Sequence, residues 1–232
     1  MSNNFRKVLN ESCSLLDTYK GRDKIIRTLC YLSRLFGELQ SNPEIQQKCN
    51  TFSTQMSATR TTLRLLDDLL VLRSTLDYKF GQNEADKYMA VMVVMSNITD
   101  HIYLSLEKFS WLAKHKLLTG IDNTKWDTAS SACWVFTSYV SILKNVRFLF
   151  MMESHKSCLG QVKNISDEKL RLLKWFHIWT VCRSLLDFTH AVNTLPPGFL
   201  WSSKLSSRFI SLIGSSSSLI GLYLIIYKKC LT

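Results

Sequence analysis

Glycine and proline are scarce in this chain, and their scarcity argues against folds that need many tight turns. The 232 residues include 8 glycines and 3 prolines, whereas an average chain of this length would hold roughly two to three times as many. A β-sandwich or β-barrel requires turn residues at short, regular intervals. Disorder is also unlikely on composition, because aromatic residues make up 11% of the chain. We therefore expect an all-α protein.

The common motifs of catalysis and nucleotide binding are missing as well. The chain has no G-x-G-x-x-G, no phosphate loop, no G-x-S-x-G and no H-E-x-x-H. The adjacent carboxylates Asp67 and Asp68 would point about 100° apart on a helix, so they cannot share one substrate proton. His155 and Cys158 have H-x-x-C spacing without a second pair, and a structural zinc needs four ligands. We expect no enzyme, no cofactor and no metal site.

Acidic residues are outnumbered, which indicates an anionic partner. There are 29 lysines and arginines against 18 aspartates and glutamates, a formal net charge of +11. Such a charge attracts nucleic acid or anionic lipid. No nucleic-acid-binding motif is visible, and the apolar segments described below favour lipid. The seven cysteines are widely spaced without any C-x-x-C, which favours a reducing, cytosol-facing environment over a disulfide framework.

Residues 20–39 have the pattern of an amphipathic helix. Apolar residues from Ile25 to Leu39 recur at steps of three or four, and basic residues follow the same period on another face. Such a helix either lies in the plane of lipid headgroups or packs on a core with its basic face in water. The candidate headgroup ligands in this segment are Lys20, Arg22, Lys24, Arg27 and Arg34.

A second amphipathic helix is expected over residues 57–76. Leu65, Leu69, Leu72 and Leu76 form one apolar row, and Arg60 and Arg64 lie on the opposite side as further candidate headgroup ligands. The alternative for this segment is again a helix packed on a core.

Residues 209–227 form the clearest candidate for a membrane span. They are 19 residues without a charge, and a helix of that length covers about 28 Å, close to the hydrocarbon thickness of a bilayer. Lysines and an arginine flank both ends, so the charge pattern does not orient the span. Small residues spaced four apart would let helices approach closely and predict self-association. These residues are Gly214, Ser217, Ser218 and Gly221.

Two other uncharged stretches are shorter. Residues 128–143 are uncharged but are followed by Lys144 and Arg147, so spanning, interfacial and soluble-core placements all stay open. Residues 88–99 are too few to span a bilayer, and we expect them to begin a buried helix.

Several segments resemble the peroxin-11 family of peroxisomal membrane proteins. Tyr19-Lys20-Gly21-Arg22-Asp23-Lys24 resembles the family's N-terminal signature, and residues 62–69 (TLRLLDDL) resemble its second block. Residues 187–201 (DFTHAVNTLPPGFLW) and the last apolar segment are similar to the gamma branch in particular. The resemblance covers nearly the whole chain and implies a single domain over residues 1–232.

The resemblance implies a function in membrane remodelling rather than in catalysis. Family members lie in the peroxisomal membrane, self-associate and associate with other members, and promote elongation before fission by a dynamin-like GTPase with its adaptor. Gamma-type members place both termini in the cytosol, which requires an even number of spans and fits 128–143 together with 209–227.

From these patterns we expect a wedge mechanism. The spans would anchor the chain while helices 20–39 and 57–76 insert shallowly into one leaflet and favour curvature. The alternatives are a pore for solutes, which predicts polar residues lining the spans, and a membrane-anchored adaptor whose helices bind partner proteins.

Overall fold

The computed structural model describes residues 3–118, 120, 122–154 and 167–229, and helices dominate these ranges. They contain no strand, which confirms the all-α prediction. The His155–Cys158 pair lies outside the described residues. The helices are α1 (Asn3–Leu16), α2 (Tyr19–Leu39), α3 (Pro43–Leu63), the 3₁₀ turn η1 (Arg64–Leu66), α4 (Asp67–Asp77), the 3₁₀ turn η2 (Lys79–Gly81), α5 (Lys87–Lys114), α6 (Asn123–Ser154), α8 (Asp167–Asn193) and α9 (Ser207–Lys229).

The helices begin and end where the sequence supplies capping residues. The side chain of Thr18 accepts a hydrogen bond from the backbone N–H of Gly21 at 3.1 Å, so α2 begins directly after it. Asn42 caps α3 in the same manner, with Pro43 in the first turn. Asp86 caps α5. α8 ends at Asn193, close to Pro196 and Pro197, which disfavour continuation of a helix.

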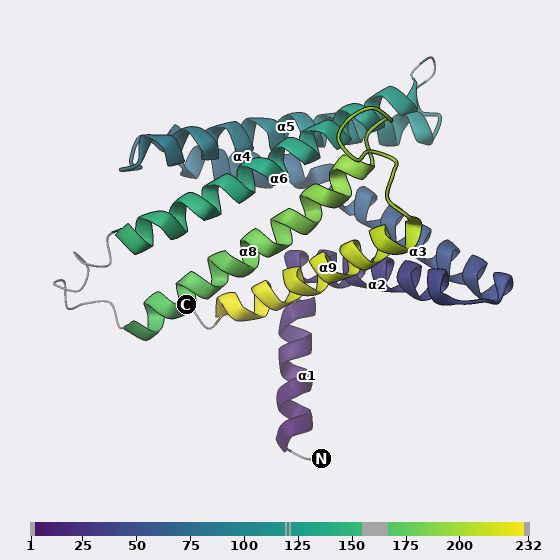
Figure 1. The fold of residues 1–232 in the computed structure, drawn as a ribbon, viewed down its shortest axis with the longest axis horizontal. Coiled ribbons are helices and arrows are strands. Elements are labelled where there is room, and N and C mark those ends of the chain that lie inside the picture. Colours follow the sequence, from purple (N-terminus) through teal and green to yellow (C-terminus); the bar gives the residue numbers. More distant parts are fainter. Residues whose placement is uncertain (1–2, 119, 121, 155–166, 230–232) are drawn as a thin grey trace.

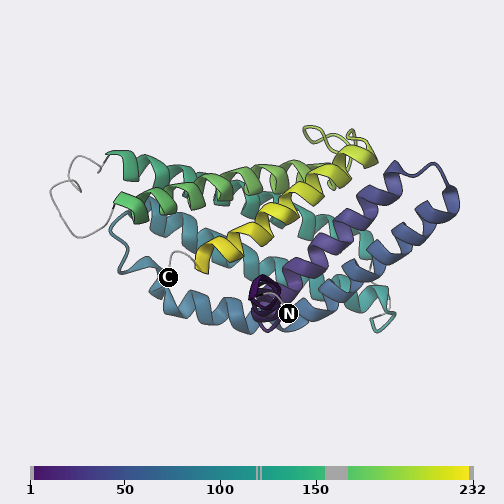
Figure 2. The ribbon, with the colours of Figure 1, turned by 90° about the horizontal axis from the view of Figure 1, so that it is seen from below.

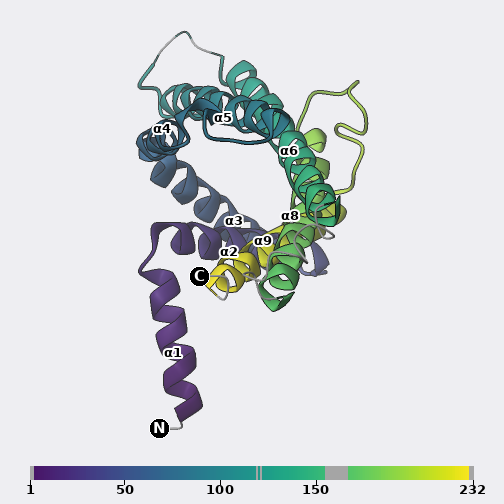
Figure 3. The same ribbon diagram turned by 90° about the vertical axis from the view of Figure 1, so that its left-hand side faces the viewer.

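The long helices follow one another around a ring. α5 packs on α6, α6 on α8, α8 on α9, α9 on α2 and α2 on α3, and α3 and α4 return to α5. Viewed along the helices, these elements are arranged around a common axis (Figure 3). α2 and α3 form an antiparallel pair (Figure 2). α1 leaves this ring and projects away from it (Figure 1).

The connection between α1 and α2 is a tight elbow. A Cβ atom on Gly21 would overlap the carbonyl of Leu15, so only glycine fits at this point. Arg22 Nε donates a hydrogen bond to the carbonyl of Leu16 at 2.6 Å. The end of α9 also reaches this elbow, where Lys229 Nζ donates to Ser14 Oγ at 2.7 Å. The elbow therefore joins the last turn of α1 to the last turn of α9.

The structure divides the amphipathic helix that the sequence predicted over residues 57–76. It consists of the end of α3, the turn η1 and α4. The hydroxyl of Tyr19 donates to the carbonyl of Leu63 at 3.2 Å, at the position where α3 ends. Asp67 and Asp68 then occupy the first turn of α4, where carboxylates are favoured by the helix dipole. Both local features support a new helix start that apolar periodicity does not reveal.

Among the described residues, two helices are long and apolar enough to cross a bilayer, α5 and α9. α9 contains the expected segment 209–227. The second candidate is α5 rather than residues 128–143, which lie within α6. Serine and threonine occupy six of those sixteen positions and lower the hydropathy of the segment. The predicted buried start at 88–99 is wrong, because Tyr88, Val91 and Ile98 are exposed.

Candidate membrane site and polar interior

Large apolar side chains lie on the outside of the ring. On α5, Tyr88 is 72% exposed and Val91 is 57% exposed. Only 11% of the most apolar stretch of α5 is buried, against 50% for α9. A helix that packs in the core of a soluble protein buries such a stretch, so the exposure of α5 is typical of contact with lipid.

The apolar rows of α2 and α4 also face outward. On α2 the exposed residues include Leu32, Phe36 and Leu39, and on η1 and α4 the most exposed are Leu66 and Leu69, at 76% and 69%. The amphipathic pattern of both predicted segments is therefore real. The apolar face of each points away from the rest of the molecule, where it can meet acyl chains.

The interior of the ring is polar. Among the described residues, the buried polar and charged side chains outnumber the buried apolar ones, fifteen to ten, and ten of the fifteen are serines. Soluble proteins show the opposite distribution. An apolar exterior around a polar, hydrogen-bonded interior is the arrangement that a surrounding bilayer favours.

A buried ion pair lies where α2, α8 and α9 meet. Arg27 Nη2 of α2 donates to Asp187 Oδ1 of α8 at 2.5 Å and to Ser217 Oγ of α9 at 3.2 Å. Ser217 Oγ in turn donates to the same carboxylate oxygen at 2.5 Å. The two charged side chains are about nine-tenths buried. We call Arg27, Asp187 and Ser217 the three-helix network.

The charges in this region shift one another's pKa values. Burial opposes ionisation of Asp187, but Arg27 and Arg183 outweigh burial and hold the pKa of this carboxyl below its usual value. Burial and the neighbouring Arg27 lower the pKa of Lys24 to about 8. Burial and Arg27 also lower the pKa of His190 to about 4, so this imidazole is neutral at pH 7. Burial and the nearby arginines therefore disfavour a further positive charge at Lys24 and His190.

Two further ion pairs tie α3 and η1 to their neighbours. Arg60 Nε donates to Asp23 Oδ1 at 2.9 Å, which links α3 to α2. Arg64 pairs with Glu107 of α5, and the hydroxyl of Tyr103 donates to the same Glu107 carboxylate at 3.1 Å. Each of these arginines is thus held by one carboxylate from a different element.

The structure separates the basic residues that the sequence grouped as candidate headgroup ligands. Lys20 and Arg22 are exposed. Arg27 is buried in the three-helix network, and Lys24, Arg34, Arg60 and Arg64 are half-buried. The faces that the sequence assigned to the headgroups therefore turn largely inward, and the apolar faces turn outward.

The small residues of α9 pack within the chain. Gly214 lies against the ring of Tyr31, where an added Cβ would come within 2.6 Å of Cε1. A Cβ added at Gly221 would meet Arg183 Cδ at an ordinary contact distance of 3.5 Å. Ser217 belongs to the three-helix network, and Ser218 Oγ donates to the carbonyl of Gly214. In the structure α2 and α8 occupy this stripe, so a second copy could reach it only by displacing them.

Sequence reasoning did not single out Asp187 or Tyr31. Asp187 is the one carboxylate between Leu172 and Pro196, within an otherwise apolar and basic helix. An isolated acid in such a helix signals a buried partner of opposite charge. Tyr31 gave no signal, because its role depends on the absence of a side chain at Gly214 of another helix.

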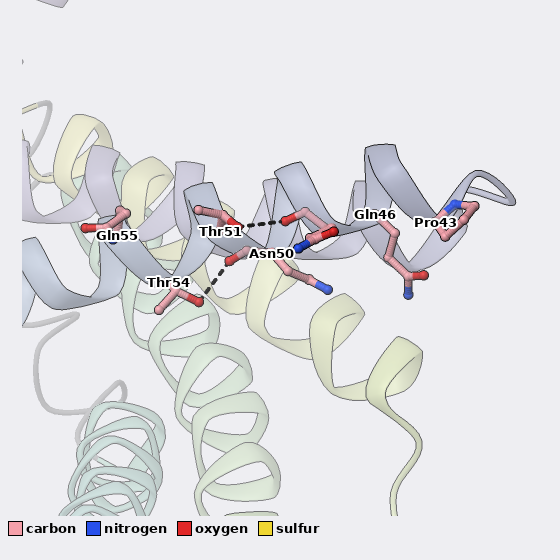
Figure 4. Close-up of a pocket in the computed structure, with 7 residues that line it drawn as sticks. Pro43, Gln46, Asn50, Thr51, Thr54 and Gln55 are labelled. Carbon is pink, nitrogen blue, oxygen red and sulfur yellow. Dashed lines mark hydrogen bonds between the residues drawn. The ribbon is translucent and has the colours of Figure 1, made fainter.

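A hollow on the surface of α3 is a weaker candidate for a functional site than the interior. It is lined by Pro43, Gln46, Asn50, Thr54 and their neighbours, all from α3, and has a volume of about 410 Å³ (Figure 4). Thr54 Oγ1 is already bonded to the carbonyl of Asn50. None of the described residues that line the hollow is charged. Across the described residues, no three His, Cys, Asp or Glu side chains are grouped to hold a metal ion.

The apolar exterior, the polar interior and the two candidate spans define an all-helical membrane protein. The family model of peroxisomal biogenesis factor 11 (PEX11) matches residues 9–226. The chain belongs to this family of peroxisomal membrane proteins, which is implicated in peroxisome biogenesis and whose members are not known as enzymes.

Three relatives match over nearly their full length. Peroxisomal membrane protein 11C of Mus musculus is 29% identical over 223 residues, 92% of each chain. Peroxisomal membrane protein 11C of Homo sapiens is 28% identical over 234 residues, 93% of each chain. Peroxisomal membrane protein PMP27 of Saccharomyces cerevisiae is 26% identical over 231 residues, 89% of each chain. No solved structure matches the chain.

Proposed function

We propose that this chain remodels and elongates the peroxisomal membrane, and so promotes peroxisome proliferation and fission. In this proposal α5 and α9 anchor the chain as a multi-pass protein with cytosolic termini. The apolar faces of α2 and α4 insert shallowly into one leaflet. Insertion into one leaflet increases its area relative to the other, which favours curvature.

The observation that carries the proposal is the unpartnered leucine row of η1 and α4. Leu66, Leu69, Leu70, Leu72 and Leu76 are each between 46% and 76% exposed. Their helix is held to the ring on its other side, where Lys108 of α5 pairs with Asp68 and Arg64 pairs with Glu107. These two ion pairs thus hold the helix against α5 with the leucine row facing outward.

The structure reduces the number of basic residues that are free to contact lipid phosphates in the wedge mechanism. Lys20 and Arg22 are the exposed cations at the start of α2 and suit contact with lipid phosphates. Arg27, Arg60 and Arg64 are engaged by Asp187, Asp23 and Glu107. The proposed binding to anionic membranes therefore depends mainly on apolar area, and we expect a weak response to salt.

The proposal is tested with the full chain reconstituted in vesicles that contain anionic lipid. Tubules are counted by electron microscopy for the wild type and for the double variant Leu69→Gln/Leu72→Gln. We expect the double variant to insert but to form few tubules. Arg73→Gln is the matched control, because Arg73 is an exposed residue of the same helix. Equal tubulation by the double variant would contradict the wedge.

Membership of the family supports the wider proposal on partners. We infer that the chain associates with further copies and with other family members, and acts before a fission adaptor and a dynamin-like GTPase. Crosslinking in isolated peroxisomes would identify the faces involved. Partner contacts on the leucine row in place of lipid contacts would favour an adaptor over a wedge.

The polar interior favours one second candidate, a pore for small solutes. Three cavities are lined by residues of the ring helices, and one of them shares lining residues with each of the other two. Release of a small polar dye from reconstituted vesicles separates the two candidates, because a wedge alone leaves the vesicles sealed while a pore empties them.

A further inference from the structure

Three cavities between the helices adjoin one another, because one of them shares lining residues with each of the other two. The central cavity has a volume of about 320 Å³. It shares Tyr31, Arg60 and Glu107 with a cavity of about 550 Å³, and Arg64 and Asp100 with a third of about 400 Å³. These volumes lie within the range of small-molecule sites.

The central cavity is lined by three arginines that converge from different elements. Arg27 comes from α2, Arg60 from α3 and Arg64 from η1, against two lining carboxylates, Asp100 and Glu107. Hydroxyl groups of both tyrosines and threonines complete the wall. The lining thus combines guanidinium groups with hydroxyl hydrogen-bond donors, and the three arginines pair with Asp187, Asp23 and Glu107.

Donors on two of these arginines are unused. Both hydrogen bonds of Arg27 leave from Nη2, and its Nε is buried without a partner among the described residues, although the residue is only 8% exposed. Arg64 pairs with Glu107 through Nη2, and within the same described ranges its Nε is likewise buried and unpartnered. A guanidinium carries five N–H donors, and a buried donor left unpaired is unfavourable.

An anion would satisfy this arrangement. Guanidinium groups bind carboxylates and phosphates through paired, charge-assisted hydrogen bonds. A buried site that excludes water strengthens such bonds. A cation would face three guanidinium groups, which disfavour it.

We propose that the central cavity binds an anionic group, a phosphate or a carboxylate, belonging either to a lipid headgroup or to a free solute. This function is separate from membrane elongation, because it uses the interior of the ring rather than its apolar exterior. Arg27, Arg60 and Arg64 supply the charge, and the hydroxyls of Tyr31 and Tyr103 supply neutral donors.

The test uses the full chain in neutral detergent micelles with inorganic phosphate as the probe and chloride of equal ionic strength as the reference. Trp134 lines the cavity, and its fluorescence reports occupancy in a variant whose other tryptophans are replaced by phenylalanine. In the unmodified chain, the shift in Tm reports binding. We expect a saturable response to phosphate that chloride does not produce. Acetate, used in place of phosphate, tests in the same manner whether the cavity binds a carboxylate.

The informative variant is Arg64→Gln/Glu107→Gln, which removes both members of one ion pair and so leaves no unpaired buried charge. We expect it to fold and to bind phosphate about tenfold or more weakly, as loss of a charged hydrogen-bonding partner predicts. Tyr103→Phe is a milder second variant with a smaller expected loss. Arg73→Gln, on the surface of α4, is the matched control and binds as the wild type does.

Nanodiscs distinguish the two sources of the anion. If phosphatidic acid weakens phosphate binding relative to phosphatidylcholine, the cavity takes a lipid headgroup; if phosphate binds equally in both, it takes a free solute. A wild type without a saturable response to phosphate or acetate, or a double variant with unchanged affinity, overturns the proposal. Neither result affects the tubulation assay, so the two proposals fail independently.

Discussion

Asp187 connects three helices through a single carboxylate. It accepts hydrogen bonds from Arg27 and Ser217 and lies 3.6 Å from Arg183. A charge at this depth is tolerated only when it is paired, because an isolated buried ion is strongly unfavourable. The same residue therefore both neutralises the interior and fixes α2, α8 and α9 in their relative positions.

His190 gives the interior a pH response. Its pKa is lowered to about 4 by burial and by Arg27, partly offset by Asp187, while Arg34 adds to the lowering. Between pH 6.5 and 4 the unfolded chain binds a proton on this residue that the folded chain does not bind. Stability is therefore lost as the pH falls through this window.

We expect acidification from pH 7 to pH 5 to lower the Tm of the wild type more than that of His190→Gln. The measurement is thermal unfolding in micelles at both pH values. His115→Gln serves as the control, because His115 is exposed at the end of α5. Identical pH responses of the wild type and His190→Gln would show that His190 does not titrate in this window.

The α2–α9 contact depends on one glycine. The ring of Tyr31 lies directly over Gly214 and makes an edge contact with His190 at 5.4 Å between ring centroids. This arrangement encloses Tyr31 between α9 and α8. The stripe of small residues therefore matters for packing inside one chain, whether or not it also matters between chains.

Gly214→Ala is expected to destabilise the chain by about 1–3 kcal/mol, the usual cost of forcing extra volume into a packed contact. Gly221→Ala is the matched control on the same helix, since its added Cβ meets only ordinary contacts, the nearest at 3.5 Å. Unfolding free energies in micelles compare the two. A loss for Gly221→Ala as large as that for Gly214→Ala would assign the effect to helix flexibility instead of Tyr31.

The sequence predicted the helical class, α9 and the bounds of α2, because apolar periodicity and an uncharged run are local signals. It did not predict the break at Arg64–Leu66, which coincides with the hydroxyl of Tyr19 contacting the carbonyl of Leu63, 44 residues away. It also did not predict that Arg27 turns inward. A helical wheel shows that a face is basic, but the partner Asp187 lies on a helix 160 residues later.

At the scale of the whole molecule, the ring is apolar outside and polar inside. α5 is a candidate span although its uncharged stretch is short, because the helix has 28 residues and its most apolar stretch of 18 residues carries no more than two charged side chains. The serines of α9 face α2 and α8, while Leu212 and Leu219 are exposed. One helix thus presents its polar side to the interior and its apolar side outward.

We expect the wild type to stay in the membrane pellet after carbonate washing and the double variant Leu212→Asp/Leu219→Asp to be released. Each carboxylate placed at the centre of a span disfavours insertion by roughly 2.5–3.5 kcal/mol. Leu212→Ala/Leu219→Ala is the control and should stay in the pellet. Release of the wild type would contradict a transmembrane placement of α9.

The elbow between α1 and α2 has a topological consequence. The hydrogen bond between Lys229 and Ser14 brings the last turn of α1 to the basic end of α9. α1 has 14 residues, about 21 Å of helix, too little to traverse a hydrocarbon layer of about 30 Å. Its first turn must therefore stay in the same aqueous compartment as Lys228, and a membrane-impermeant reagent that labels one of these ends would label the other from the same side.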